Sequence, residues 1–275
     1  MTGHQSAAGQ RVRCAARLEL RALPGVPIVE SGQELAPLVE AALARASIVL
    51  VDGDVVVVAS KVVSRAEGRF VDLSTVTPSA RATALGAETD KDARVVELIL
   101  RDTAEISRKA RGVLVVRHRL GFIAANASID LSNAQPAHAT ADSGPWVLVL
   151  PKSPDASAER LRAALHARTG AQIGVVITDS LGRPFRVGTV GAAIGLAGLP
   201  ALWDRRGEPD LFGRTLEQTI TALADQIAAA ADLVAGQAAE RRAFVHVRGM
   251  SFDAGEPGEH SADALYRPAA QDLYA

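Results

Sequence analysis

Short apolar runs rich in β-branched residues alternate along the chain with segments of helical pattern. Residues 55–59 are continuously apolar, which is typical of a strand covered on both faces, and the apolar, β-branched run from residue 173 predicts another buried strand. Further strands are predicted at residues 17–23, 113–116, 121–125, 146–150 and 244–247. The second and third of these flank a short basic turn and predict a hairpin.

Helical patterns occupy much of the remaining chain. The predicted helices span residues 31–46, 92–111, 153–170 and 216–234. The first begins at a capping box made by Ser31 and Glu34, and the third has Pro154 at its first position. Gly112 and Gly236 follow the second and fourth, where glycine commonly ends a helix. The pattern predicts an α/β (mixed α+β) fold with mixed sheets and packed helices. A loose leader over residues 1–17 would precede a single domain over residues 18–273, which could consist of two lobes.

Composition narrows the classes of partner. The 275 residues are 48% hydrophobic, with 30 basic and 31 acidic side chains and a pI near 6.6. That balance gives no bulk attraction for nucleic acid or an anionic membrane. The single cysteine, Cys14, excludes an internal disulfide and fits a cytoplasmic protein. The most apolar run, residues 48–58, contains Asp52 and Asp54, so we expect no membrane span.

Polar side chains follow three predicted strands. These sets are Ser60, Lys61 and Arg65; Asp130 and Asn133; and Asp179 and Ser180, with Arg183 close behind. Ligands of open α/β sheets bind where strands end. Mg²⁺ and Mn²⁺ prefer oxygen ligands and often use one or two carboxylates together with substrate phosphates. Asp130 and Asp179 are of the right type, and Lys61, Arg65 and Arg183 could neutralise phosphoryl charge.

Each of these residues also has a purely structural explanation. Asp179 and Asp130 could cap turns, Lys61 could be a solvated surface residue, and Gln237 could simply follow a helix. The chain contains neither GxxxxGK[ST] nor GxGxxG, so the common nucleotide-binding motifs are not present. His118 and His246 show no zinc-binding spacing and are predicted to be turn and strand residues.

Several longer motifs together resemble one family. They are Gly25-Val-Pro-Ile28, Gly53-Asp54, Ser60-Lys-Val-Val-Ser-Arg-Ala-Glu-Gly-Arg69, Ala125-Asn-Ala-Ser-Ile-Asp-Leu-Ser-Asn133, Leu150-Pro with Ser153-Pro-Asp-Ala-Ser157, Thr178-Asp-Ser-Leu-Gly-Arg-Pro-Phe-Arg186 and Ala193-Ile-Gly-Leu-Ala-Gly198. Their order resembles that of the coenzyme F-420-0:L-glutamate ligase family, and the similarity covers residues 18–273. Collinear order makes the set far more specific than any single motif.

The resemblance implies a reaction and an assembly. Family members use GTP to join L-glutamate to a glutamate-free deazaflavin coenzyme, F-420-0, and some add further γ-linked glutamates. The resemblance also implies the family's own gamma-glutamyl ligase fold, an intertwined homodimer, Mg²⁺ or Mn²⁺ as two ions, and K⁺.

The matching motifs also imply which residues of this chain form the site. Asp130 and Asp179 resemble ligands of a first metal, which implies a catalytic role, whereas Ser180 and Gln237 resemble ligands of a second. The positions that resemble the guanine-nucleotide site are Val26, Pro27, Ile28, Val29, Ser60, Lys61, Arg65, Asn133, Ala235, Gly236, Gln237 and Ala238.

The chain departs from the family pattern at four positions. Arg65 stands where Lys is usual and Ser180 where Thr is usual, while Leu131 replaces a common Arg and Ala192 lies near a position that is often acidic. The last two motivate an alternative, a paralogue that binds deazaflavin or nucleotide without ligation. A metal-dependent phosphohydrolase is a third possibility.

Overall fold

The computed structural model of the protein describes residues 12–140, 143–252 and 260–271. Its centre is a five-stranded mixed sheet in the order β1-β12-β2-β8-β9. The strands are β1 (Arg13–Ala22), β12 (Phe244–Ser251), β2 (Val55–Ala59), β8 (Gly174–Gly182) and β9 (Thr189–Ala197). β2 and β8 run parallel, and the other neighbours are antiparallel. The carboxyl ends of β2 and β8 therefore meet at one edge.

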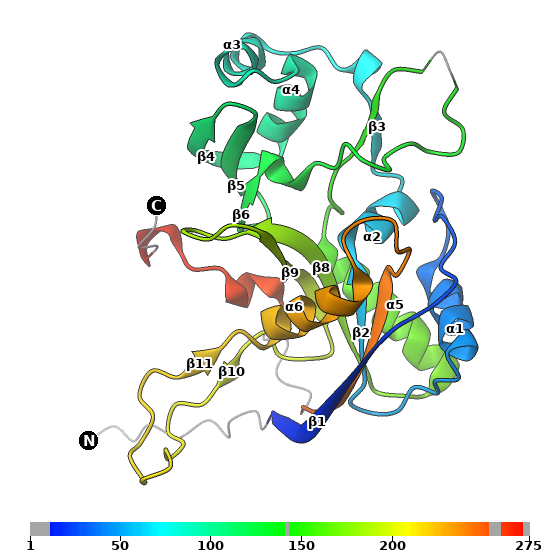
Figure 1. Cartoon of the computed structure of the whole chain (residues 1–275), viewed down its shortest axis with the longest axis vertical. Helices are drawn as coiled ribbons and strands as arrows, with labels where there is room; N and C mark the ends of the chain where they lie inside the picture. The colour runs from blue at the N-terminus through cyan, green and yellow to red at the C-terminus, as the bar shows by residue number, and fades with distance from the viewer. Residues whose placement is uncertain (1–11, 141–142, 253–259, 272–275) are drawn as a thin grey trace.

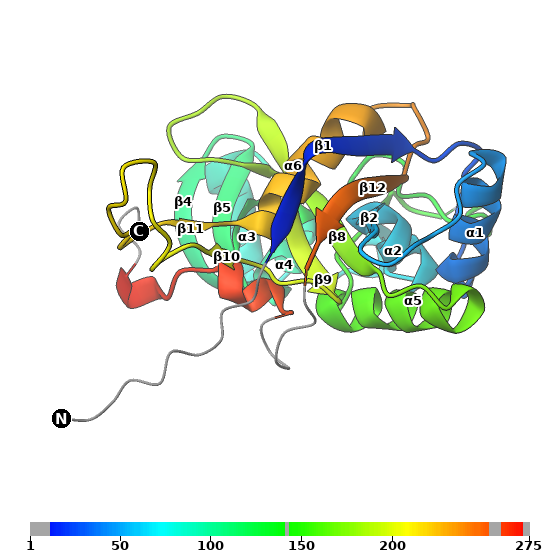
Figure 2. The ribbon, with the colours of Figure 1, turned by 90° about the horizontal axis from the view of Figure 1, so that it is seen from below.

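Helices cover both faces of this sheet. Figures 1 and 2 show α1 (Leu35–Arg45) and α5 (Pro154–Thr169) on one side and α6 (Leu223–Ala235) on the other. Val56 and Val58 of β2 pack in the first apolar cluster. Val55 and Val57 pack in the second. The prediction of a strand buried on both faces is confirmed, because alternate side chains enter different cores.

A smaller unit lies at the top of Figure 1, above the central sheet. It comprises α3 (Ala80–Thr89), α4 (Ala93–Arg101), β4 (Thr103–Ala110), β5 (Val113–His118) and β6 (Ile123–Ala125). It has its own apolar cluster, which includes Val96, Ile99 and Leu114. The β3 (Phe70–Asp72) and β7 (Trp146–Leu148) strands pair with each other.

Two short segments complete the architecture. The α2 helix (Ser60–Ala66) follows β2 without an intervening loop. The β10 (Trp203–Asp204) and β11 (Ile220–Thr221) strands form the base of a hairpin that extends away from the sheet in Figure 1. None of the helices in the described ranges has the length and apolarity that a membrane crossing would need.

Several sequence predictions are confirmed. The architecture is mixed α/β, and β5 and β6 form the predicted hairpin. The α5 helix begins at Pro154 and ends before Gly170, whose φ of +75° reverses the chain. Residues 1–11 of the predicted leader lie outside the described residues, and the leader prediction is wrong for residues 13–17, which belong to β1.

The prediction of one helix over residues 92–111 is wrong. The α4 helix ends at Arg101, and residues 103–110 form β4, paired with β5. The buried apolar side chains of the helical pattern, such as Val96 and Ile99, all precede Arg101. Gly112, with φ +77°, turns the β4–β5 hairpin. The glycine thus marks a strand turn rather than a helix end.

Two predicted helix starts are also wrong. The α1 helix begins at Leu35 with Glu34 as its N-cap, so Ser31 makes no capping box. Pro37 gives the reason, because proline is tolerated only in the first turn of a helix. The α6 helix begins at Leu223 instead of residue 216, because residues 220–221 pair as β11.

The sequence also places Asp179 and Ser180 in a loop after a strand, which is wrong. The β8 strand continues to Gly182 and pairs with β9. Asp179 lies opposite Ala192, and Ser180 lies opposite Gly191. Both polar side chains are therefore held by a paired backbone rather than by a turn.

Candidate functional site

A cavity of about 900 Å³ opens at the sheet edge where β2 and β8 converge. Every residue that the sequence assigns to a nucleotide or metal site lines it. These residues are Val26, Pro27, Ile28, Val29, Ser60, Lys61, Arg65, Asp130, Asn133, Asp179, Ser180, Ala235, Gly236, Gln237 and Ala238. Arg183 is not among the lining residues and lies beyond Gly182, after the end of β8. The fold brings together segments that are far apart in sequence.

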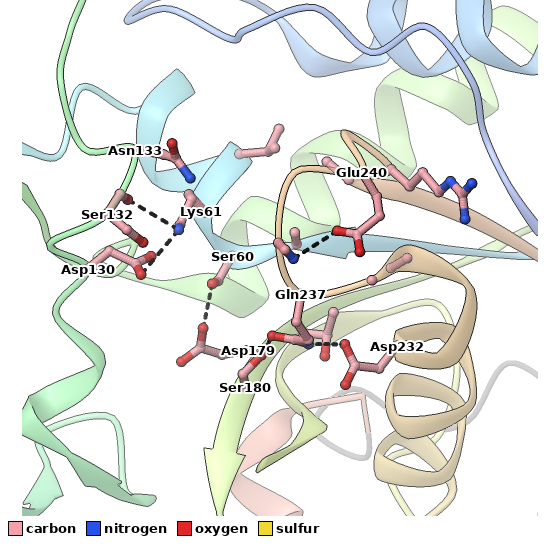
Figure 3. A pocket seen from close by; sticks show the side chains of 18 of the residues that line it. Ser60, Lys61, Asp130, Ser132, Asn133, Asp179, Ser180, Asp232, Gln237 and Glu240 are labelled. Atoms are coloured by element: carbon pink, nitrogen blue, oxygen red, sulfur yellow. Dashed lines mark hydrogen bonds and ion pairs between the residues drawn. The ribbon is translucent and has the colours of Figure 1, made fainter. Parts of the chain in front are cut away.

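Strand register places Asp179 beside Ser60. β2 and β8 pair in parallel with Ala59 opposite Thr178, so the next residue of each strand reaches the same edge. The Ser60 hydroxyl, at the start of α2, donates a hydrogen bond of 2.8 Å to Oδ1 of Asp179 (Figure 3). Ser60 is buried. Its hydroxyl therefore fixes the Asp179 carboxylate, although the sequence assigns Ser60 to the nucleotide.

Asp130 is held by a backbone bridge and faces a lysine. Asp130 and Leu148 exchange two backbone hydrogen bonds of 2.9 Å. The Nζ of Lys61 lies 3.2 Å from Oδ1 of Asp130 and donates to the carbonyl of Ser132 at 3.3 Å. In Figure 3, the Asp130 and Lys61 side chains lie on the opposite side of Ser60 from Gln237.

The surroundings of Asp130 change the pKa of its carboxyl group. Burial raises the pKa of Asp130, Lys61 opposes this effect, and the negative charge of Asp179 raises the pKa further. A carboxylate whose neighbours do not fully compensate its charge favours an added cation. Asp130 and Asp179 thus face a common space that suits positive charge.

Arg65 connects two segments that line the cavity. The guanidinium is buried and donates to the carbonyls of Val29 at 2.6 Å, Asn133 at 2.9 Å and Gln135 at 3.2 Å. It also pairs with Glu30 at 3.1 Å. These contacts join the segment before α1 to the loop after Asp130. Lys61 is therefore better placed than Arg65 to meet a phosphate.

The opposite wall contains a chain of polar contacts. The Ser180 hydroxyl lies 2.7 Å from Oε1 of Gln237. The Nε2 of Gln237 donates to a carboxylate oxygen of Asp232. The other Asp232 oxygen accepts from the backbone N–H of Gly191 at 3.1 Å. Figure 3 shows Asp232 on α6, next to the loop that carries Gln237.

The donor set fits a hard divalent cation. The described residues contain no group of three His, Cys, Asp or Glu side chains that could hold a metal ion. Mg²⁺, however, usually binds through one or two carboxylates, with other oxygens completing an octahedron. Adjacent ligands about 2.1 Å from such an ion are roughly 3 Å apart. The 2.7 Å between Ser180 Oγ and Gln237 Oε1 is compatible with that spacing.

Sequence reasoning missed one residue of this wall. Asp232 lines the cavity and contacts Gln237, but its residue type alone resembles that of an ordinary exposed position on an Ala-rich helix. A usable signal is its place one turn before Gly236. A helix that ends at glycine turns the chain back, and the next side chain can reach the last turn.

A family model described as F420-0:Gamma-glutamyl ligase matches residues 25–249 of the chain. A protein from Methanothermobacter thermautotrophicus named Coenzyme F420:L-glutamate ligase is 44% identical over 261 residues, which cover 94% of this chain and 98% of that protein. Proteins of the same name from Methanopyrus kandleri and Archaeoglobus fulgidus are 42% and 37% identical. Each covers 94% of this chain, with 97% and 96% of the relative aligned.

Proposed function

The chain belongs to the F420-0:Gamma-glutamyl ligase family, and we propose that it joins L-glutamate to the glutamate-free deazaflavin coenzyme F-420-0 at the expense of GTP. Further γ-linked glutamates would be added by the same chemistry. The observation that carries the proposal is the convergence of Asp130, Asp179 and Lys61 in one cavity. The relatives' printed names supply the glutamate and the coenzyme.

The proposed chemistry has two steps, because a carboxylate is a poor electrophile. The acceptor carboxylate first attacks the γ-phosphorus of GTP, giving an acyl phosphate and GDP. The glutamate amine then attacks the acyl carbon, phosphate leaves, and the nitrogen loses a proton to form the amide. Lys61, which lines the cavity 3.2 Å from Oδ1 of Asp130, would offset phosphoryl charge. Catalysis depends mainly on positioning and electrostatics.

Bound Mg²⁺ or Mn²⁺ would supply charge stabilisation for phosphoryl transfer. Asp130 and Asp179 would hold one ion, while Ser180 and Gln237 would contribute to a second; K⁺ is a further expected ion. Ser60 would orient Asp179 through its 2.8 Å hydrogen bond. Arg65 would keep the two nucleotide-facing loops in place.

The test is incubation of the protein with GTP, MgCl₂ or MnCl₂, L-glutamate and F-420-0, followed by mass spectrometry. We expect a product heavier by one glutamate residue, together with GDP and phosphate. Matched reactions lack glutamate or contain ATP instead of GTP. GTP hydrolysis that does not need glutamate would support a phosphohydrolase. Tight binding of F-420-0 without GTP turnover would support a non-ligating paralogue.

We also propose that the protein works as a homodimer. Phe185 and Val187, in the turn between β8 and β9, are almost completely exposed. Leu211 and Phe212, in the β10–β11 hairpin, are 91% and 92% exposed. Apolar side chains on two protruding hairpins provide surface that an interface would bury. Light scattering coupled to gel filtration tests this, and a monomer at micromolar concentration would contradict it.

A further inference from the structure

Gln237 has an amide side chain whose two ends are chemically opposite. Its oxygen can only accept hydrogen bonds or bind a cation, whereas its nitrogen can only donate. The proposed metal role therefore requires the oxygen to face Ser180. Ser180 cannot impose that orientation, because a hydroxyl both donates and accepts.

Asp232 can impose it. An ionised carboxylate only accepts hydrogen bonds, so the Gln237 end that faces it has to be the nitrogen. The structure shows this arrangement: Nε2 donates to Asp232 and Oε1 lies 2.7 Å from Ser180 Oγ (Figure 3). We propose that Asp232 is a positioning residue that turns the Gln237 oxygen towards the cation site. This inference rests on the proposed metal-dependent function.

The Asp232 carboxylate is itself held by a second hydrogen bond. Its second oxygen accepts from the N–H of Gly191, the residue that lies opposite Ser180 in the β8–β9 pairing. Gly191 packs closely on α6, since a Cβ there would lie 2.6 Å from the carbonyl oxygen of Ala228. The Asp232 side chain thus contacts both Gly191, the pairing partner of Ser180, and the Gln237 amide.

The loop that carries Gln237 is shaped for this contact. The N–H of Gly236 donates to the carbonyl of Asp232 at 3.1 Å and closes the helix. Gly236 has φ +79°, a conformation that suits glycine. The chain therefore reverses within one residue, and Gln237 returns to the last helical turn.

The first test is titration of the full-length protein with Mn²⁺, measuring free Mn²⁺ by electron paramagnetic resonance. Loss of a residue that orients a metal ligand typically weakens affinity about 10- to 100-fold. We expect Asp232→Asn to weaken one class of sites by that factor. The matched control is Asp225→Asn, because Asp225 also lies on α6 and accepts from a β9 amide, that of Ala193 at 2.9 Å. The control should keep the wild-type affinity.

The second test separates orientation from charge or local structure. A glutamate at position 237 presents an oxygen from either end and needs no orientation. Asp232→Asn should therefore weaken Mn²⁺ binding in the wild-type background but not in the Gln237→Glu background, where it also removes the repulsion between the carboxylates at positions 232 and 237. Equal loss in both backgrounds would overturn the inference, as would wild-type affinity in Asp232→Asn alone. If the wild-type protein binds no Mn²⁺, the metal part of the proposed function falls too.

Discussion

Asp54 and Asp130 are acids near opposite ends of β2, and their surroundings differ. Asp54 precedes β2 and is 1% exposed. Arg248 donates two hydrogen bonds to it, at 2.8 and 2.7 Å, and the N–H of Val51 donates a third at 3.0 Å. The Nε2 of His246 lies 2.9 Å from the same carboxylate. Asp130, by contrast, has one cation at 3.2 Å.

The pKa directions report this difference. Burial alone would raise the pKa of Asp54, but Arg248, His246 and Val51 outweigh it and lower the pKa to about 2. Burial dominates at Asp130, and its pKa is raised. A fully compensated carboxylate stabilises the fold, whereas an under-compensated one is suited to a bound cation. One end of β2 therefore serves stability, and the other serves the proposed chemistry.

The largest expected effect comes from Asp179→Asn, which tests whether the cavity end of β2 serves chemistry rather than stability. A cation contributes several kcal/mol to phosphoryl transfer, and loss of about 4 kcal/mol corresponds to roughly 1,000-fold in rate. We expect at least that loss of ligation, with an unchanged unfolding midpoint, because Asp179 is not a core residue. Mass-spectrometric product rates and urea denaturation check the two halves. A normal rate would remove Asp179 from the chemistry.

Asp54→Ala should have the opposite profile. It leaves Arg248 and His246 beside a buried gap, and loss of one partner from a buried ionic network costs about 3–5 kcal/mol. We expect the free energy of unfolding in urea to fall by that amount while the Mn²⁺ affinity of the folded protein is retained. A weakened Mn²⁺ affinity with unchanged stability would reverse the assignment of the two ends.

Low pH should remove the stabilisation that the Asp54 network contributes. The folded pKa of about 2 lies below the usual aspartate value of 3.8, so the stabilisation is present above about pH 4 and is lost as pH falls towards 2. The shift corresponds to about 2 kcal/mol. The stability difference between the wild type and Asp54→Asn should narrow by that amount between pH 5 and pH 2. A difference that is constant with pH would show that Asp54 is not held as an anion.

The sequence motifs predicted some residues of the cavity but not the contacts between them. The motifs selected Asp130, Asp179 and Ser180 as candidate site residues, and the structure shows that all three line one cavity. They could not show that Ser60 bonds Asp179 across 119 residues, because that contact depends on the parallel register of β2 and β8. Asp232 was missed for the same reason, since its role is set by strand pairing of Gly191.

The errors of fold prediction have a related cause. Ile106 continued the helical spacing after Arg101, but residues 103–110 pair with β5 and satisfy their backbone there. The local sequence pattern does not reveal the stabilisation that this pairing with β5 provides. The local signals at Pro154 and Gly170 correctly marked the ends of α5, whereas the equally local capping box at Ser31 did not start α1.

The mildest test addresses the hydrogen bond between Ser60 and Asp179. Ser60→Ala removes a donor to a charged acceptor, which contributes about 1.5 kcal/mol when water can partly replace it. We expect ligation to slow roughly tenfold, with a smaller effect than Asp179→Asn because the carboxylate remains. Ser64→Ala is the matched control, since Ser64 is buried one turn further along α2 and does not line the cavity. If both variants lose activity equally, the Ser60 hydroxyl acts through the packing of α2 and not through Asp179.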